Sequence, residues 1–146
     1  MTDPIRLRRR PGWEVALPDF LKAAEGRPFC WGQNDCVLFL ADWTAILTGQ
    51  DFAARHRGKY KTARGAAGVL KRMGAADPAG LIDLHVPRHE AVLLARRGDA
   101  AAVPAAADCA LCVGIVDDSG SKVAVVAEAG LARYPLTSAK VAWRIG

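Results

Sequence analysis

No hydrophobic run in this 146-residue chain is long enough to cross a lipid bilayer, since the longest run is interrupted by Asp42. The basic residues near the start of the chain are not followed by an apolar segment, so no secretory signal peptide is expected. The sequence also contains no phosphate-binding glycine loop, no zinc-protease motif and no recognised nucleic-acid-binding module. We therefore expect neither a membrane-spanning nor a secreted protein, and no protein of these motif classes.

Cysteine and histidine are scarce, with four and three copies respectively. In the reducing cytoplasm expected for a chain without a signal peptide, four cysteines are more typical of thiols than of a disulfide framework. Cys109 and Cys112 have the spacing of half a zinc site, which Cys30 and Cys36 could complete. Residues three apart in a strand point to opposite faces, which disfavours zinc, and no helix follows Cys109 as a redox pair requires. No metal or other cofactor is predicted.

The bulk composition is that of an ordinary globular domain. Hydrophobic residues make up 51% and charged residues 24%, and the length suits a single domain over residues 1–146. The net charge is +5, and part of it lies in a basic N-terminal arm, residues 1–12, which contains the sequence RLRRR. Such a cluster is either a solvated tail or a contact for an acidic surface. We expect the arm to contact neighbouring proteins of a larger particle.

Three helices are predicted in the first half of the chain, over residues 17–26, 36–48 and 63–73. Asn34 or Asp35 can cap the second helix. The residues that share one apolar stripe of this helix, at spacings of four, three and four, are Cys36, Leu40, Trp43 and Leu47. The second helix is therefore expected to be buried along this stripe.

After about residue 91 the sequence changes to short β-rich runs separated by turn residues. These runs cover residues 91–103, 110–118, 122–130, 131–136 and 140–146, and residues 117–122 have the composition of a hairpin turn. The Ala/Pro-rich stretch 100–108 is predicted to be a loop between strands. Helices followed by strands predict an α+β fold, with N-terminal helices packed on a C-terminal antiparallel sheet of about five strands.

A cysteine in the first turn of a buried helix has a chemical use. The helix N-terminus carries partial positive charge and unpaired N–H groups, which favour the nucleophilic thiolate form of Cys36 over the thiol. The alternative is that Cys36 is a small buried core residue, as cysteine often is.

Three segments, in order, resemble the NlpC-type papain-like cysteine peptidases: FCWGQNDCVLFLADW at residues 29–43, RRGDAAAV at 96–103 and LCVGIVDDSG at 111–120. The resemblance implies a papain-like fold with Cys36 as the nucleophile, preceded by Asp35. Because they lie in the loop beside Cys36, Trp31 and Gly32 are predicted to border the substrate groove. Small phage and prophage proteins with NlpC-like domains in tails look most similar.

The resemblance fails at the position of the catalytic histidine, which in this chain is Cys112. A thiol cannot replace an imidazole as a proton carrier near neutral pH. Glu128 is the one polar candidate for the family's third catalytic position. The three histidines, His56, His85 and His89, are predicted to lie in surface loops, although one of them could supply the missing base.

The resemblance therefore predicts an NlpC-like domain of a phage or phage-derived tail, a structural or assembly component whose cysteine peptidase activity is lost or weakened. It would be made in the host cytoplasm and then be part of the particle. The alternative is an active cysteine hydrolase of cell-wall peptides that uses Cys36. A third hypothesis, an acidic-polymer or nucleic-acid binder, rests on the basic residues around Tyr60, whose default interpretation is a solvated loop.

Overall fold

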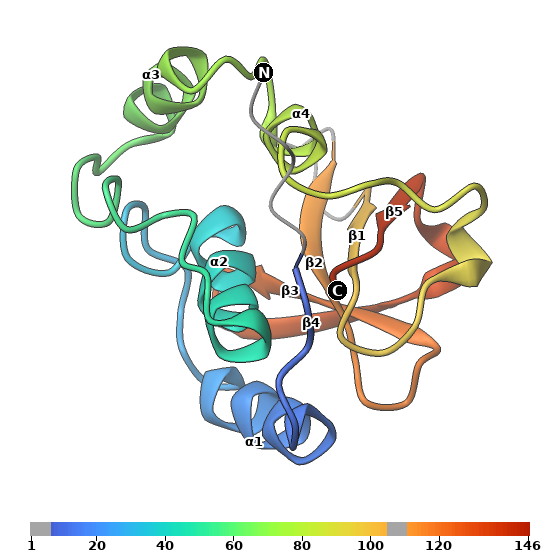
Figure 1. Ribbon diagram of the computed structural model, residues 1–146. Coiled ribbons are helices and arrows are strands. Elements are labelled where there is room, and N and C mark those ends of the chain that lie inside the picture. Colours follow the sequence, from blue (N-terminus) through green and yellow to red (C-terminus); the bar gives the residue numbers. More distant parts are fainter. Residues whose placement is uncertain (1–6, 105–110) are drawn as a thin grey trace.

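Helices precede the sheet along the chain in the computed structural model, which describes residues 7–104 and 111–146 (Figure 1). The α-helices of this part are α1 (Trp13–Ala24), α2 (Cys36–Thr48), α3 (Ala63–Arg72) and α4 (Pro78–Asp83). The strands are β1 (Ala100–Val103), β2 (Cys112–Val116), β3 (Lys122–Ala127), β4 (Gly130–Pro135) and β5 (Val141–Trp143), and two 3₁₀ turns are η1 (Val92–Leu94) and η2 (Leu136–Ser138). The predicted α+β class is confirmed.

The five strands form one antiparallel sheet in the order β4-β3-β2-β1-β5. In the register of the inner strands, Ala102 of β1 lies opposite Val113 of β2 on one side and Val141 of β5 on the other. The predicted hairpin at residues 117–122 joins β2 to β3. Antiparallel neighbours joined by short turns are the expected arrangement for such runs.

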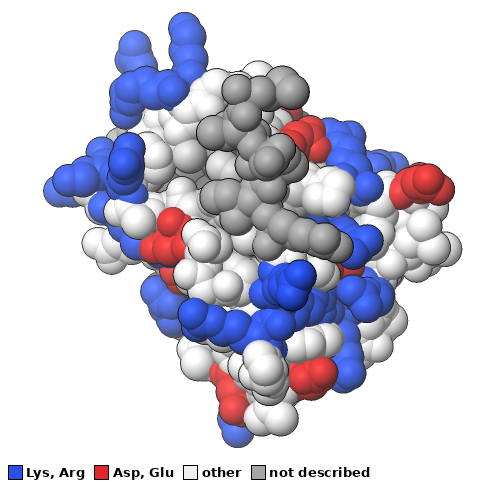
Figure 2. Space-filling view, in the orientation of Figure 1, with Lys and Arg blue, Asp and Glu red and all other residues white. Residues whose placement is uncertain are grey.

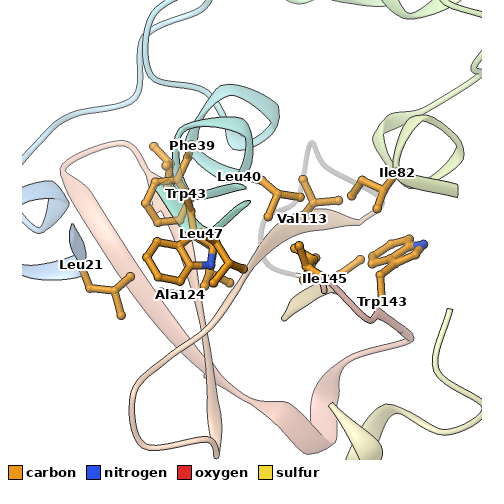
Figure 3. Close-up of a cluster of buried hydrophobic side chains, with 14 of the residues drawn as sticks. Leu21, Phe39, Leu40, Trp43, Leu47, Ile82, Val113, Ala124, Trp143 and Ile145 are labelled. Carbon is orange, nitrogen blue, oxygen red and sulfur yellow. The ribbon is translucent and has the colours of Figure 1, made fainter. Parts of the chain in front are cut away.

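The two faces of the sheet have different covers. Helices α1, α2 and α4 pack on one face through a cluster that includes Leu21, Phe39, Trp43, Leu47, Ile82, Val113, Ala124 and Trp143 (Figure 3). The opposite face packs against residues around η1 and η2, in a second cluster that includes Ala95, Val103, Val116, Val125 and Leu136. We call these the helix face and the far face of the sheet.

Local sequence accounts for helix α2. Asp35 is its N-cap, and its side chain accepts a hydrogen bond from the amide of Leu38. Gly49 ends the helix with φ of 84°, a left-handed conformation that glycine adopts at low cost. The predicted stripe is confirmed, because Leu40, Trp43 and Leu47 belong to the helix-face cluster and Cys36 packs against it.

Two predicted boundaries were wrong, and a third segment had two predictions. Helix α1 begins at Trp13 rather than at residue 17, and Pro18 lies inside it. The run predicted as a strand from residue 91 instead forms the 3₁₀ turn η1, and the strand begins only at Ala100. Residues 100–103, which fall both in the predicted β-rich run 91–103 and in the predicted loop 100–108, form strand β1, whose four side chains are fully buried. Pairing on both edges of β1 outweighs the weak strand preference of alanine; residues 105–108 of the predicted loop lie outside the described part.

A buried ionic network connects the N-terminal arm to the sheet. Asp99 is fully buried, and its Oδ1 accepts hydrogen bonds from the Arg9 guanidinium at 2.6 Å and from the Ile145 amide at 3.1 Å. Its Oδ2 lies 2.8 Å from Nε2 of His89 and accepts from the Arg96 amide at 2.9 Å. His89 is therefore not the surface-loop histidine that was predicted, because a buried carboxylate holds its ring.

The basic arm is also bound to its own fold at this point. Arg9 donates to the carbonyl oxygens of Ile145 and Arg97 and lies 4.3 Å from the ring centroid of Trp13. Arg8 and Arg10, on either side, are exposed. Within the described arm, the arginine side chains that are open to a partner are thus those of Arg8 and Arg10.

Helix α3 lies at the edge of the molecule, and Lys and Arg side chains gather over it and the neighbouring turn (Figures 1 and 2). It is strongly amphipathic, yet Val69 is its one fully buried residue in the described structure. No helix of the described ranges is both long and apolar enough to span a membrane.

Candidate functional site

A short closed loop leads into helix α2. Cys30 and Asn34 exchange two backbone hydrogen bonds, of 3.1 and 2.8 Å, which bring the two ends of the loop together. Gly32, between them, has φ of 79° and donates its amide to Oδ2 of Asp35 at 3.0 Å. The loop is thereby held to the N-cap that starts the helix.

The carboxylate of Asp35 is buried and hydrogen-bonded within the protein rather than exposed to solvent. Its side chain is 1% exposed and accepts from the Leu38 amide, the Gly32 amide and the hydroxyl of Tyr60. These three donors come from the helix, the loop and the segment after α2, so Asp35 ties the three together. Its charge stabilises the cap and is satisfied within the fold.

Tyr60 is a site residue that sequence analysis missed. It packs against Leu38 and Ala41 of α2, and its hydroxyl reaches Asp35. Burial, together with the hydrogen bond to Asp35 and the nearby charges of Asp35 and Cys36, raises the pKa of Tyr60 well above its usual value. A lone tyrosine in a basic loop carries no signal for this contact, which depends on residues 25 positions apart.

Cys36 is the first residue of α2 and is half-buried against the helix-face cluster. Its position at the helix N-terminus is the one predicted. Trp31 precedes it in the loop, half-buried, with its ring 4.7 Å from that of Phe29 in an edge-on arrangement. Gly32 is buried within the loop.

The sheet does not bring Cys112 to Cys36. Cys112 packs with the far-face cluster, whereas Cys36 packs with the helix-face cluster. Alternation along β2 explains the separation, since Val113 and Ile115 point to the helix face and Cys112 and Val116 to the far face. The helix-face residues of the three inner strands are Ala100, Ala102, Val113, Ile115, Ala124 and Val126, all apolar.

Glu128 is exposed in the turn between β3 and β4. The turn adjoins the loop before α2, because the Phe29 amide donates to the carbonyl of Ala127 at 3.2 Å. Cys109, the other half of the Cys-x-x-Cys pair, lies outside the described residues. In the described ranges, no group of three or more His, Cys, Asp or Glu side chains is arranged to hold a metal ion.

A cavity of about 320 Å³ opens beside Cys36, bounded by α2, α3, α4 and the segment between α2 and α3. Its wall includes Trp31, Asp35, Cys36 and Tyr60 together with two histidines, His56 and His85. The ring of His85 packs on Phe52 with centroids 4.4 Å apart, and burial lowers the pKa of His85. A lowered pKa favours the neutral imidazole, the form that accepts a proton.

Replacing Tyr60 with phenylalanine should destabilise the fold by about 2 kcal/mol at pH 7, because a hydrogen bond to a buried carboxylate is lost. The raised pKa predicts the pH dependence. The folded protein retains the Tyr60 proton more strongly than the unfolded chain, so this contribution is complete below pH 10 and declines as the pH rises beyond the ordinary tyrosine value. Urea denaturation of the wild type and the variant at pH 7 to 11 measures the difference between their free energies of unfolding. A difference that does not become smaller above pH 10 would contradict the prediction.

A protein-family model matches most of the chain. Residues 8–145 match the family model described as a domain of unknown function (DUF6950). No curated protein and no solved structure matches the chain.

Proposed function

The chain belongs to the DUF6950 family, and we propose that it is an NlpC-like domain of a phage or phage-derived tail. In this proposal it is a structural or assembly component that has lost the cysteine peptidase activity of the papain-like scaffold. Two features support an NlpC-like ancestry: the capped helix that begins at Cys36, and the antiparallel sheet on which it packs.

The observation that carries the loss of activity is the apolar helix face of the sheet. A general base must come within hydrogen-bond reach of the nucleophile. The residue at the expected histidine position, Cys112, packs on the far face, and its neighbours Val113 and Ile115 on the helix face cannot carry a proton. On the described part of β2, no helix-face side chain can therefore act as this base.

The proposed contacts with other tail proteins involve the N-terminal arm. Arg9 is used within the fold, so Arg8 and Arg10, which are exposed, are the described arm residues that we assign to a partner surface. Exposed arginine is well suited to a carboxylate-rich surface, because its planar guanidinium forms bidentate hydrogen bonds.

Genetic complementation tests this function. Deleting the gene from the phage or prophage that carries it should abolish infectious particles, and the Cys36→Ala variant should restore them as well as the wild-type chain does. The protein should also be detected by mass spectrometry in purified particles. Normal particles after deletion, or absence of the protein from them, would overturn the tail assignment.

One observation favours the alternative, an active hydrolase of cell-wall peptides. His56 and His85 line the same cavity as Cys36, so an imidazole from outside the sheet could serve as the base. In that case purified protein should cleave peptidoglycan peptides, and Cys36→Ala and one of His56→Ala or His85→Ala should abolish cleavage. Cys30→Ala is the matched control, because Cys30 is an exposed thiol in the same loop.

A further inference from the structure

We propose that the cavity beside Cys36 binds a linear aliphatic chain with a single anionic head, the chemistry of a fatty acid. This inference does not depend on the proposed tail function or on catalysis by Cys36. It rests on the lining of the cavity, on its dimensions and on the charge around it.

The lining of the cavity is mainly apolar. Helix α3 contributes Ala66, Ala67, Val69 and Leu70, and α2 and α4 contribute further aliphatic side chains across from it. No lysine or arginine side chain is part of the described wall. A pocket with apolar walls and few polar groups favours ligands whose buried part is apolar.

Most polar groups on the wall are already engaged within the protein. Asp35 accepts three hydrogen bonds, and the Thr44 hydroxyl donates to the Leu40 carbonyl at 2.8 Å. Asp77 caps α4 by accepting from the Gly80 amide at 2.7 Å. These groups are therefore not free to bind a polar ligand body, which leaves apolar contact as the main attraction.

The dimensions suit one chain. The lining residues of α3 and its C-cap run from Ala63 to Met73, and ten residue steps in a helix correspond to about 15 Å. A volume of about 320 Å³ is at the lower end of the range for ligand pockets, and beside a wall of this length it suits one slender ligand.

One side of the cavity is strongly basic. Residues 51–77, which form one of its sides, contain seven Lys or Arg and two Asp, a net charge of +5 that equals the charge of the whole chain. Six of these basic residues are exposed: Arg55, Lys59, Lys61, Arg64, Lys71 and Arg72. Figure 2 shows Lys and Arg side chains gathered over α3 and the neighbouring turn. An anionic head at the opening would lie near this charge, and a cationic head would be repelled.

The test compares heads of opposite charge on the same chain. Dodecanoate and dodecyltrimethylammonium are titrated into the purified protein below their critical micelle concentrations. Dodecanoate should bind at least tenfold more tightly, and the preference should decrease when the salt concentration is raised. Equal affinity for the two compounds, or no binding of dodecanoate, would overturn the proposal.

A methyl resonance reports where binding occurs. The chain has two methionines, and Met73 lines the cavity. With ¹³C-methyl methionine, dodecanoate should shift the Met73 resonance, which the Met73→Leu variant assigns. A dodecanoate titration that leaves this resonance unmoved would place the ligand elsewhere and contradict the proposal.

Variants separate the apolar and the ionic parts of the site. Ala66→Trp, which fills the cavity from α3, should weaken dodecanoate binding at least tenfold. Arg64→Glu with Lys71→Glu should remove most of the preference for the anionic head. The matched control is Lys122→Glu with Lys140→Glu, which makes the same charge change at exposed positions at the start of β3 and just before β5. If Ala66→Trp leaves binding intact while both charge variants weaken it equally, binding is a general surface effect and the cavity proposal is wrong.

Discussion

Replacing Asp99 with asparagine should lower the free energy of unfolding by about 3–5 kcal/mol, because it breaks a buried ion pair from one side. Asp99 is fully buried, and the side chain of its partner Arg9 is only 8% exposed. Without the carboxylate, the guanidinium of Arg9 stays buried with no compensating charge. The same change weakens the anchors that Asp99 provides for His89 and for the Ile145 amide.

Urea denaturation followed by circular dichroism measures the free energy of unfolding of the wild type and of Asp99→Asn. Asp118→Asn is the matched control, because Asp118 is exposed in the hairpin turn, and it should change stability by less than about 0.5 kcal/mol. Arg9→Met should destabilise by a similar amount to Asp99→Asn, and the double variant should cost clearly less than the sum of the two. Additive effects would mean that Arg9 and Asp99 do not act as a pair.

Replacing Gly32 with alanine should destabilise the fold by about 2–4 kcal/mol, through two separate effects. Gly32 has φ of 79°, which strains a residue with a side chain. The added Cβ would also overlap the backbone carbonyl oxygen of Tyr60, which cannot move without shifting the segment that carries the Asp35 hydrogen bond.

Gly58→Ala separates the two effects. Gly58 lies opposite Gly32, since its amide donates to the Gly32 carbonyl, and it has φ of 71°. A Cβ at Gly58 would meet no atom within 4 Å. Its replacement should cost about 1 kcal/mol, the strain alone. In Gly32→Ala, iodoacetamide should also modify Cys36 faster than in the wild type, because the loop before α2 is displaced. Equal losses in the two alanine variants would show that the contact with Tyr60 contributes nothing.

Helix α2 shows how much the sequence could predict. Its cap at Asp35, its end at Gly49 and its buried stripe all depend on residues within a few positions of each other. Capping and periodicity are local interactions, so the sequence contains the information for them. The segregation of helices and strands, and hence the α+β class, follows from the same local patterns.

Long-range contacts were the source of the errors. Residues 100–103 fell in a predicted β-rich run and also in a predicted loop, and pairing with β2 and β5 on both edges makes them a buried strand. His89 is held by Asp99, and Arg9 reaches the same carboxylate across 90 residues. Tyr60 reaches Asp35 from a segment that looked like a solvated basic loop. No periodicity or cap indicates these partners.

The sequence alone determined that a capped, buried helix begins at Cys36 and that an antiparallel sheet follows it, because capping groups and hydrophobic periods act over a few residues. Only the tertiary structure decided which groups stand near that sulfur. Because side chains alternate along a strand, Cys112 lies on the far face. Tyr60 and two histidines lie on the wall of the cavity, and Asp99 binds Arg9 of the N-terminal arm. Such contacts join residues from separate elements, and packing of the whole chain is what selects them.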